Sequence, residues 1–309
     1  MVLLSLFDYN RHIVMGKRAI FYDYRKNVDM TLPSSKRLYK RLGDYDTLAE
    51  YTMCALLDFE KYCDTSMTFS EYVTLKAKEH QINLRGGVTL GNYKVALIKS
   101  FIVNSHAILS DFIKHYRDDI RDLFTRDFKL ADDDKVSELT RLLRALSSID
   151  INPQFPSWLL PVMDYYRMVR NSVAHNERDK EACEKAYEKV DKDAIDADYW
   201  VFKGKVPNPA DSITMDDFYF YSACIKHVAN YLVMVLKGRV NWRNIGYTHT
   251  DLDPANIKKG TDSVKLVGRV FLQYAHRGTK EELRNILDVL KERKEEYKVS
   301  LYLAKKGKK

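Results

Sequence analysis

Apolar residues recur at three- and four-residue steps from Thr89 onward, and this periodicity is the feature that most constrains the fold. Steps of this size place apolar side chains on one face of a helix, so the chain between residues 89 and 237 predicts a helical bundle. Carboxylates, small hydroxyl side chains and a closing glycine mark the helix ends. The predicted helices are residues 89–116, a helix starting at Asp132–Asp134, a helix capped by Ser157, and a helix from the capping-box pair Thr214 and Asp217 to Gly238. In the third of these, the residues expected to face inward are Leu159, Val162, Met163, Tyr166, Val169 and Val173.

The regions on either side of this bundle have a different pattern. Residues 1–85 are mixed but mostly helical, with a strand expected at residues 18–25 and helices at residues 36–78. Apolar stretches at residues 264–272 and 299–303 favour strands around a helix that Thr279 begins, which predicts a small α/β unit. The fold class is therefore mainly α, with three predicted parts: residues 1–85, a bundle at 86–240 that contains a charged, partly helical insertion or long loop at 179–211, and the α/β unit at 241–309.

Composition excludes several classes of protein. Only 12 glycines and 7 prolines occur in 309 residues, so long flexible linkers are not expected. No apolar run approaches the ~20 residues that cross a bilayer, and the N-terminus lacks the features of a signal peptide. The four cysteines form no Cys-x-x-Cys pair, so no zinc or thioredoxin-like site is indicated. These features predict a cytoplasmic protein with no membrane partner.

The most informative stretch of the chain is residues 165–178, Tyr-Tyr-Arg-Met-Val-Arg-Asn-Ser-Val-Ala-His-Asn-Glu-Arg. On a helix, Asn171 and His175 are four residues apart and share one face. Arg170 lies about 140° around the helix from His175, at the edge of that face. One helix end can therefore present a guanidinium, an amide and an imidazole together.

These three groups suit the cleavage of RNA by its own 2′-hydroxyl. That reaction needs a proton removed from the hydroxyl, a proton supplied to the leaving oxygen, and stabilisation of charge on the phosphate. Histidine titrates near neutrality, and arginine matches phosphate through parallel donors. The scheme requires neither a metal ion nor another cofactor, and the chain shows no convincing carboxylate cluster for two metals.

The motif resembles the Arg-x4–6-His signature of HEPN ribonucleases. Its sequence is most similar to the abortive-infection (Abi-like) branch of that superfamily. The resemblance covers residues 89–237. It implies that Arg170 and His175 carry catalysis and that Asn171 orients or contacts the phosphate. It also implies a homodimer in which two motifs form one composite active site, and a role as an antiviral effector or toxin. An antitoxin or a regulatory RNA is left open as a further partner.

Two other pairs in the chain satisfy the same spacing. Arg243 precedes His249 with an asparagine after the arginine, and Arg269 precedes His276. Arg243 stands before a glycine and a polar stretch, which favours a loop, and Arg269 falls in a predicted strand. Context therefore favours Arg170, although the chemistry could instead lie at Arg243 and His249.

Further residues are candidates for RNA contact. The expected substrate-binding residues are Tyr166, Arg178, Lys203 and Lys205, with Tyr165 as a second ring that could stack on a base. Each has a simpler interpretation: the tyrosines as core, the lysines as surface charges, and Arg170 with His175 as a solvated helix end whose arginine pairs with an acid. His106, His115 and His227 are expected to be structural, although they could line the cleft.

The positive charge of the chain is unevenly distributed. The net charge is +8, and residues 241–309 contribute 16 basic and 9 acidic residues to it. The predicted bundle has no such excess, so we expect the bundle to cut RNA and the C-terminal part to recruit it. The main alternative function is a non-catalytic HEPN bundle that binds RNA or mediates dimerisation.

Overall fold

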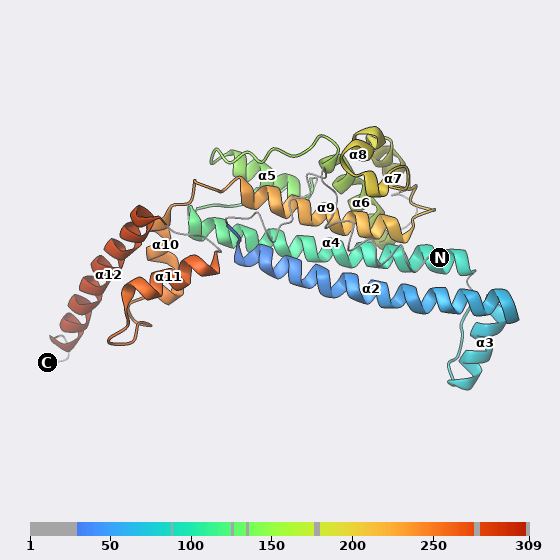
Figure 1. Ribbon diagram of the computed structural model, residues 1–309, viewed down its shortest axis with the longest axis horizontal. Helices are drawn as coiled ribbons and strands as arrows, with labels where there is room; N and C mark the ends of the chain where they lie inside the picture. The colour runs from blue at the N-terminus through green and yellow to red at the C-terminus, as the bar shows by residue number, and fades with distance from the viewer. Residues whose placement is uncertain are drawn as a thin grey trace. The chain divides into compact units, whose positions relative to one another are not determined.

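The computed structural model describes residues 30–87, 89–124, 127–133, 136–175, 180–274 and 279–306, and the regular structure of these ranges is helical (Figure 1). The prediction of a mainly α protein is therefore confirmed for the described chain. The helices are α2 (Pro33–Ser66), α3 (Phe69–Glu79), α4 (Leu90–Leu123), α5 (Glu138–Ser147), α6 (Leu159–His175), α7 (Lys180–Tyr187), α8 (Lys192–Asp198), α9 (Met215–Met234), α10 (Trp242–Thr248), α11 (Ser263–Gln273) and α12 (Lys280–Lys306), with the 3-10 turns η2 (Trp200–Phe202) and η3 (Thr250–Leu252).

The chain forms two compact units, each assembled from segments that are distant in sequence. The first unit comprises the described parts of Met1–Arg37, Asp111–Gln154 and Ala229–Lys309, and the second comprises those of Leu38–Ser110 and Phe155–Val228. The helices α2, α4 and α9 each contribute residues to both units. The division of the chain at residues 85 and 240 stays a prediction, and the strand expected at residues 18–25 lies outside the described residues.

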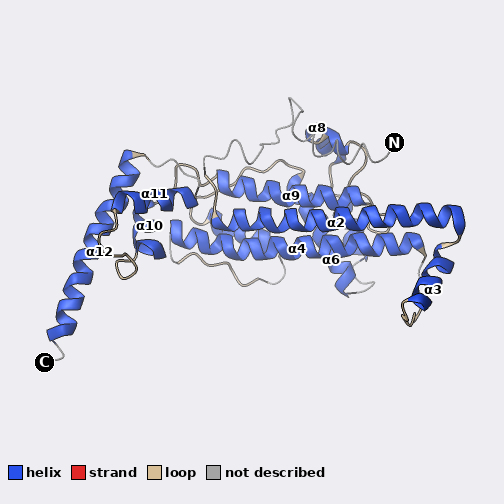
Figure 2. Cartoon of the chain, turned by 60° about the horizontal axis from the view of Figure 1, so that its bottom comes forward, coloured by secondary structure: helices blue, strands red, loops and turns tan. Residues whose placement is uncertain are grey.

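Within the second unit, α2, α4 and α9 are joined by aromatic and charged contacts. Figure 2 shows the parts of these helices that belong to the unit running side by side. The rings of Tyr45, Phe101 and Phe218, one from each helix, lie with centroids 5.4–6.1 Å apart. Asp46 of α2 accepts hydrogen bonds from Ser222 Oγ at 2.8 Å and from Lys226 Nζ at 2.6 Å, both on α9. α2 was not part of the bundle predicted at residues 86–240, and in this unit it packs with α4 and α9 of that bundle.

The helices of the insertion at residues 180–211 also belong to the second unit. The structure places α7, α8 and η2 there, as the prediction of a partly helical insertion requires. Trp158, just before α6, donates from Nε1 to Asp198 Oδ2 of α8 at 2.6 Å. The charged segment is thus fastened to the start of the helix that carries the motif.

In the first unit, helix ends differ from the sequence prediction in one case and match it in another. α5 begins at Glu138, because Ser137 caps it by accepting a hydrogen bond from Thr140 N at 3.1 Å. The predicted start at Asp132 is therefore six residues too early. Gly238 has a φ of +73°, which glycine adopts without strain, and it lies in the turn after α9 as predicted, although α9 ends at Met234 and not at Lys237.

The predicted C-terminal strands are wrong, because both segments are helical. Residues 263–273 form α11, whose buried side chains Leu266, Val267, Val270 and Phe271 follow helical spacing. Residues 299–303 fall inside α12, which begins as expected with reciprocal hydrogen bonds between Thr279 and Glu282. The run of valine and leucine suggested a strand, but tertiary packing of one helical face decides the structure.

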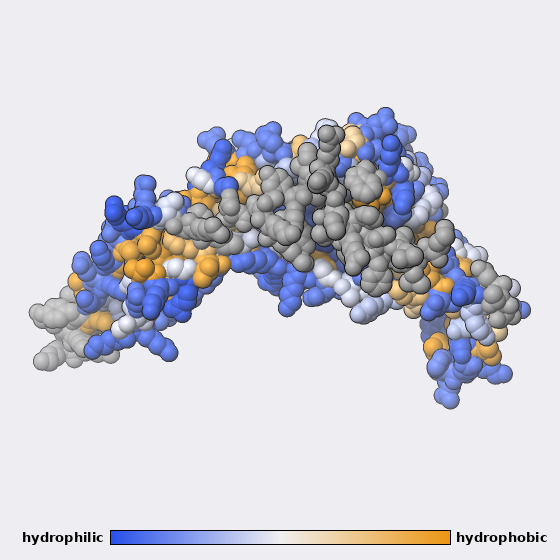
Figure 3. Space-filling view, viewed as in Figure 1, coloured by the Kyte–Doolittle hydropathy of each residue, from blue (hydrophilic) through white to orange (hydrophobic). Residues whose placement is uncertain are grey.

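The helices α10, α11 and α12 pack on one another within this unit. A Cβ added at Gly246 of α10 would lie 2.9 Å from Val289 of α12, so the close contact requires glycine. Arg293 of α12 donates from Nη1 to the Gly246 carbonyl at 2.9 Å. Figure 3 shows apolar surface over α10 and α11, where Leu272 is 73% exposed and Val264 is 52% exposed.

Among the described helices, α4 is long and apolar enough to cross a membrane by length and composition, and 44% of its apolar window is buried in the structure. A core helix passes the same test, and Phe101, Ile102 and Phe112 of α4 are buried. The test is therefore weak support for a membrane span, and the expected lack of a membrane partner stays a prediction.

Candidate functional site

The motif helix α6 is fixed by a buried apolar face. Five of the six residues expected to face inward are buried, and Val173, near the end of the helix, is instead 49% exposed. Arg170 and Asn171 lie one turn before the C-terminal residue of α6, which is His175. The helix therefore brings the three predicted catalytic residues to its last two turns, as the spacing requires.

Arg170 and Asn171 contact each other directly. Arg170 donates from Nη1 to Asn171 Oδ1 at 3.0 Å, and both side chains are half-buried. No acidic side chain of the described residues lies within ion-pair distance of Arg170. Among the described residues, the Asn171 amide oxygen is the hydrogen-bond acceptor that the structure gives the guanidinium, and it sets the direction of that group. The side chain of His175 and all of Arg178 lie outside the described part of the structure.

A second imidazole, His106 of α4, lies near Arg170. Burial and then the positive charges of Arg170 and Arg167 lower the pKa of His106 to about 4. Its Nδ1 is 2.8 Å from the Tyr221 hydroxyl of α9. His106 is therefore neutral near pH 7 and adds a polar group beside the motif. A lone histidine on an apolar helix gives no sequence signal for this position, because the packing of α4 and α6 creates it.

Tyr166 belongs to the framework behind the motif. Its side chain is fully buried, and its ring lies 4.8 Å from that of Tyr221. Its hydroxyl donates to Asp217 Oδ1 at 2.9 Å. A ring buried in this way has no face for an RNA base, so the expected stacking role of Tyr166 is replaced by a structural one. Tyr165 is also buried, and its hydroxyl donates to the Asn208 carbonyl.

Asp217 is the centre of that framework. Besides the Tyr166 hydroxyl, its carboxylate accepts hydrogen bonds from Asn208 N and Nδ2 at 2.9 and 2.8 Å. It also accepts them from Thr214 N and Oγ1 at 2.8 and 3.0 Å. A buried carboxylate with five donors is fully satisfied and holds α6, α9 and the loop before α9 in one arrangement.

Lys203 and Lys205 lie in the turn after η2, and both are exposed. The Lys205 carbonyl accepts a hydrogen bond from Asn208 Nδ2 at 2.8 Å, so the backbone of this turn is tied to the Asp217 framework. Neither lysine lines the cavity that adjoins α6. Their expected role in substrate binding stays a prediction.

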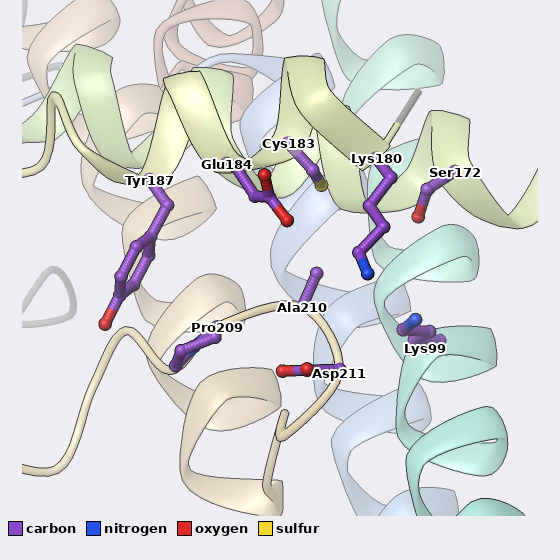
Figure 4. Close-up of a pocket in the computed structure, with 9 residues that line it drawn as sticks. All are labelled: Lys99, Ser172, Lys180, Cys183, Glu184, Tyr187, Pro209, Ala210 and Asp211. Carbon is purple, nitrogen blue, oxygen red and sulfur yellow. The ribbon is translucent and has the colours of Figure 1, made fainter. Parts of the chain in front are cut away.

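A cavity of about 340 Å³ adjoins the end of α6. Figure 4 shows its walls, which come from α4, α6, α7 and the loop before α9. The lining residues are Lys99, Ser172, Lys180, Cys183, Glu184, Tyr187, Pro209, Ala210 and Asp211. Ser172 follows Asn171 directly, so this cavity begins beside the motif.

The competing pair Arg243 and His249 is already engaged in contacts within the first unit. Arg243 Nη2 donates to both carboxylate oxygens of Glu292 at 2.9 and 3.0 Å. His249 Nε2 is 2.9 Å from Gln273 Oε1, and its Nδ1 accepts from Asp251 N at 3.2 Å.

The expected loop around Arg243 and the strand around Arg269 are wrong, because these residues lie in α10 and α11. Gly246 suggested a loop, but it serves the close contact of α10 with α12. Helical context therefore does not single out Arg170. Its lack of an acidic partner among the described residues separates it from Arg243.

Among the described residues, no three His, Cys, Asp or Glu side chains are placed to hold a metal ion. No protein-family model matches the chain, and neither a curated protein nor a solved structure is similar enough to count as a match. The resemblance to HEPN ribonucleases therefore depends on the motif and its position in the helices.

Proposed function

We propose that the chain is an endoribonuclease that cleaves RNA through its 2′-hydroxyl without a metal ion. One observation carries the proposal: Arg170, Asn171 and His175 lie on the last two turns of α6, and Arg170 has no acidic partner among the described residues. An arginine in this state is suited to binding a phosphate through two parallel hydrogen bonds.

The proposed reaction needs no group beyond Arg170, Asn171 and His175. The 2′-oxygen attacks phosphorus as its proton passes to a base, the bond from phosphorus to the 5′-oxygen breaks, and that oxygen takes up a proton. The products are a 2′,3′-cyclic phosphate and a 5′-hydroxyl. His175 supplies the acid or base function, and Arg170, oriented by Asn171, stabilises the charge on the phosphate.

A composite site in a homodimer makes a direct prediction. Mixing chains that carry Arg170→Ala with chains that carry His175→Ala should restore part of the cleavage that each has lost, because some mixed dimers contain one complete set. Sedimentation should show a dimer for each variant. A mixture as inactive as its components would contradict the composite site.

The biological role follows from the same activity. An RNA-cutting enzyme in the cytoplasm would arrest growth, as expected of a toxin or antiviral effector. Expression of the wild-type chain should therefore slow growth, and expression of His175→Ala to the same level should not. Equal toxicity of the two would contradict this role.

The second candidate is a HEPN bundle that binds RNA or dimerises without cutting. A cleavage assay on purified protein in EDTA separates the two functions. Cleavage that persists in EDTA and is lost in His175→Ala supports the enzyme. RNA binding with no cleavage in either protein supports the non-catalytic bundle.

A further inference from the structure

The cavity beside α6 has a cationic end. In Figure 4 the ammonium groups of Lys99 and Lys180 and the hydroxyl of Ser172 lie together at one end of the labelled residues. The lysines come from α4 and α7, so two helices place donors around the same space, while Ser172 Oγ of α6 donates to the Val169 carbonyl at 2.7 Å. Lysine ammonium groups bind phosphate oxygens through charge-assisted hydrogen bonds.

The two lysines have no acidic partner among the residues that the structure describes. No carboxylate of the described residues lies within ion-pair distance of Lys99 or Lys180. Lys185, on the same helix as Lys180, is by contrast paired with Glu181. Two cations that face one cavity repel each other, and an anion between them would relieve that repulsion.

The other end of the cavity is aromatic and apolar. Tyr187 and Pro209 form it, and the Tyr187 hydroxyl donates to the Pro207 carbonyl at 3.3 Å. The Tyr187 ring also lies 5.3 Å from the ring of Tyr165. These contacts fix the ring as a rigid wall, against which a planar base can pack.

Carboxylates lie between the two ends. Glu184 and Asp211 both line the cavity, and the structure gives Asp211 one hydrogen bond, from Ser212 Oγ at 3.3 Å. Carboxylates accept from the exocyclic amino groups that adenine, cytosine and guanine carry and uracil lacks. The volume of about 340 Å³ is at the small end of ligand pockets, which suits a single nucleotide unit.

We propose that this cavity binds one nucleotide of the RNA next to the cut, with its phosphate at Lys99 and Lys180 and an amino-bearing base towards Tyr187 and Asp211. The role in cleavage depends on the function proposed above. Binding of a nucleotide in the cavity does not depend on cleavage, so the two can be tested separately.

The test is calorimetric titration of the full chain with the 5′-monophosphates of adenosine, cytidine, guanosine and uridine, and with adenosine and inorganic phosphate. We expect the three amino-bearing monophosphates to bind more tightly than the uridine nucleotide, adenosine or phosphate. Lys99→Gln and Lys180→Gln should each weaken binding by about 10-fold. Asp211→Asn should reduce the preference for cytidine over uridine monophosphate.

Lys185→Gln is the matched control, because it removes a charge from α7 outside the cavity. It should leave every affinity unchanged. The proposal is overturned if no monophosphate binds, if the lysine variants bind as tightly as wild type, or if Lys185→Gln weakens binding equally. It is also overturned if Arg170→Ala abolishes binding and the cavity variants do not.

His175→Ala separates this proposal from the proposed function. If His175→Ala cleaves RNA like wild type and the cavity variants lose nucleotide binding, the cavity stands and the assigned active site fails. If His175→Ala loses cleavage and the cavity variants keep nucleotide binding, the active site stands and the cavity fails.

Discussion

The ends of α6 and α10 carry nearly the same pattern of residues in different surroundings. Each has an arginine followed by an asparagine and, five or six residues later, a histidine. In α10 the arginine is held by Glu292 and the histidine by Gln273 and Asp251 N. In α6 the arginine donates to its own neighbour, Asn171, and acts electrostatically on His106.

This difference shows what sequence spacing leaves undecided. Both arginines lie on helices, His249 directly follows α10, and both pairs satisfy the family spacing. Only the contacts show that Arg243 and His249 join α10 to α12 and α11, while Arg170 of α6 has no acidic partner among the described residues. Variants in the α6 pattern should therefore change cleavage, and variants in the α10 pattern should change stability.

The largest expected effect is on cleavage by arginine variants. Arg170→Ala should lower the cleavage rate by about 10²–10³-fold, the usual cost of losing one charge-stabilising donor. Arg243→Ala should cleave at the wild-type rate and lower only thermal stability. Single-turnover assays measure the cleavage rates, and circular dichroism measures thermal stability. Equal losses of cleavage in the two variants would contradict the distinction between α6 and α10.

The next effect concerns the framework behind α6. Asp217→Ala should lower the free energy of unfolding by about 3 kcal/mol, because it leaves several buried donors without an acceptor. Asp216→Ala removes the same charge one residue earlier, for which the structure gives no hydrogen bond, and should change stability by less than about 0.5 kcal/mol. Urea unfolding measures both, and similar losses would show that Asp217 has no special role.

A third effect is on the protonation of His106. Its pKa is about 4, below the value near 6.5 of an unfolded chain, so the unfolded state binds more protons between these pH values. Stability contributed by neutral His106 should be present above pH 6.5 and lost as the pH falls towards 4. Unfolding of His106→Gln should show a weaker loss over that range.

Replacing Arg170 also sharpens the comparison through His106. Arg170→Gln should raise the pKa of His106, because it removes one of the charges that lower it. Arg243→Gln should leave that pKa unchanged. NMR titration of the His106 ring measures this pKa. An unchanged pKa in Arg170→Gln would show that the charge of Arg170 does not act on His106.

The smallest effect concerns recruitment of RNA by the C-terminal part. Deletion of residues 241–309 is an unsuitable test, because Trp242 is buried and Asn241 N donates to the Leu123 carbonyl at 3.2 Å. Lys258, Lys259 and Lys265 are exposed, and their replacement by glutamine keeps this packing. Each lost phosphate contact should reduce the salt slope of RNA binding by about 1. An unchanged salt slope would contradict recruitment of RNA by these lysines.

The sequence predicted the helices with continuous apolar faces. It placed five of the six inward residues of α6 correctly, as well as the turn at Gly238. It missed α11, because a short run of β-branched and leucine residues suits a strand until its packing partner is known. It mistook Gly246 for a loop residue, because the close contact with Val289 is set by tertiary packing alone.

The candidate site was predicted only along one helix. The spacing of Arg170, Asn171 and His175 places them on the last turns of α6, and α6 has those bounds in the structure. Lys99 and Asp211 were not predictable, since they reach the cavity through packing of α4 and the loop before α9, whereas His106 was expected as a structural residue that could line the cleft. Helical spacing placed Tyr166 correctly on the inward face, and its burial rules out the base-stacking role that was also expected of it.

The central claim is that the end of α6, and not the similar end of α10, cleaves RNA. The most direct measurement compares His175→Ala with His249→Ala in an RNA-cleavage assay containing EDTA. We expect His175→Ala to lose at least about 10²-fold in rate and His249→Ala to cleave like wild type. Loss of cleavage in His249→Ala with full activity in His175→Ala would contradict the claim.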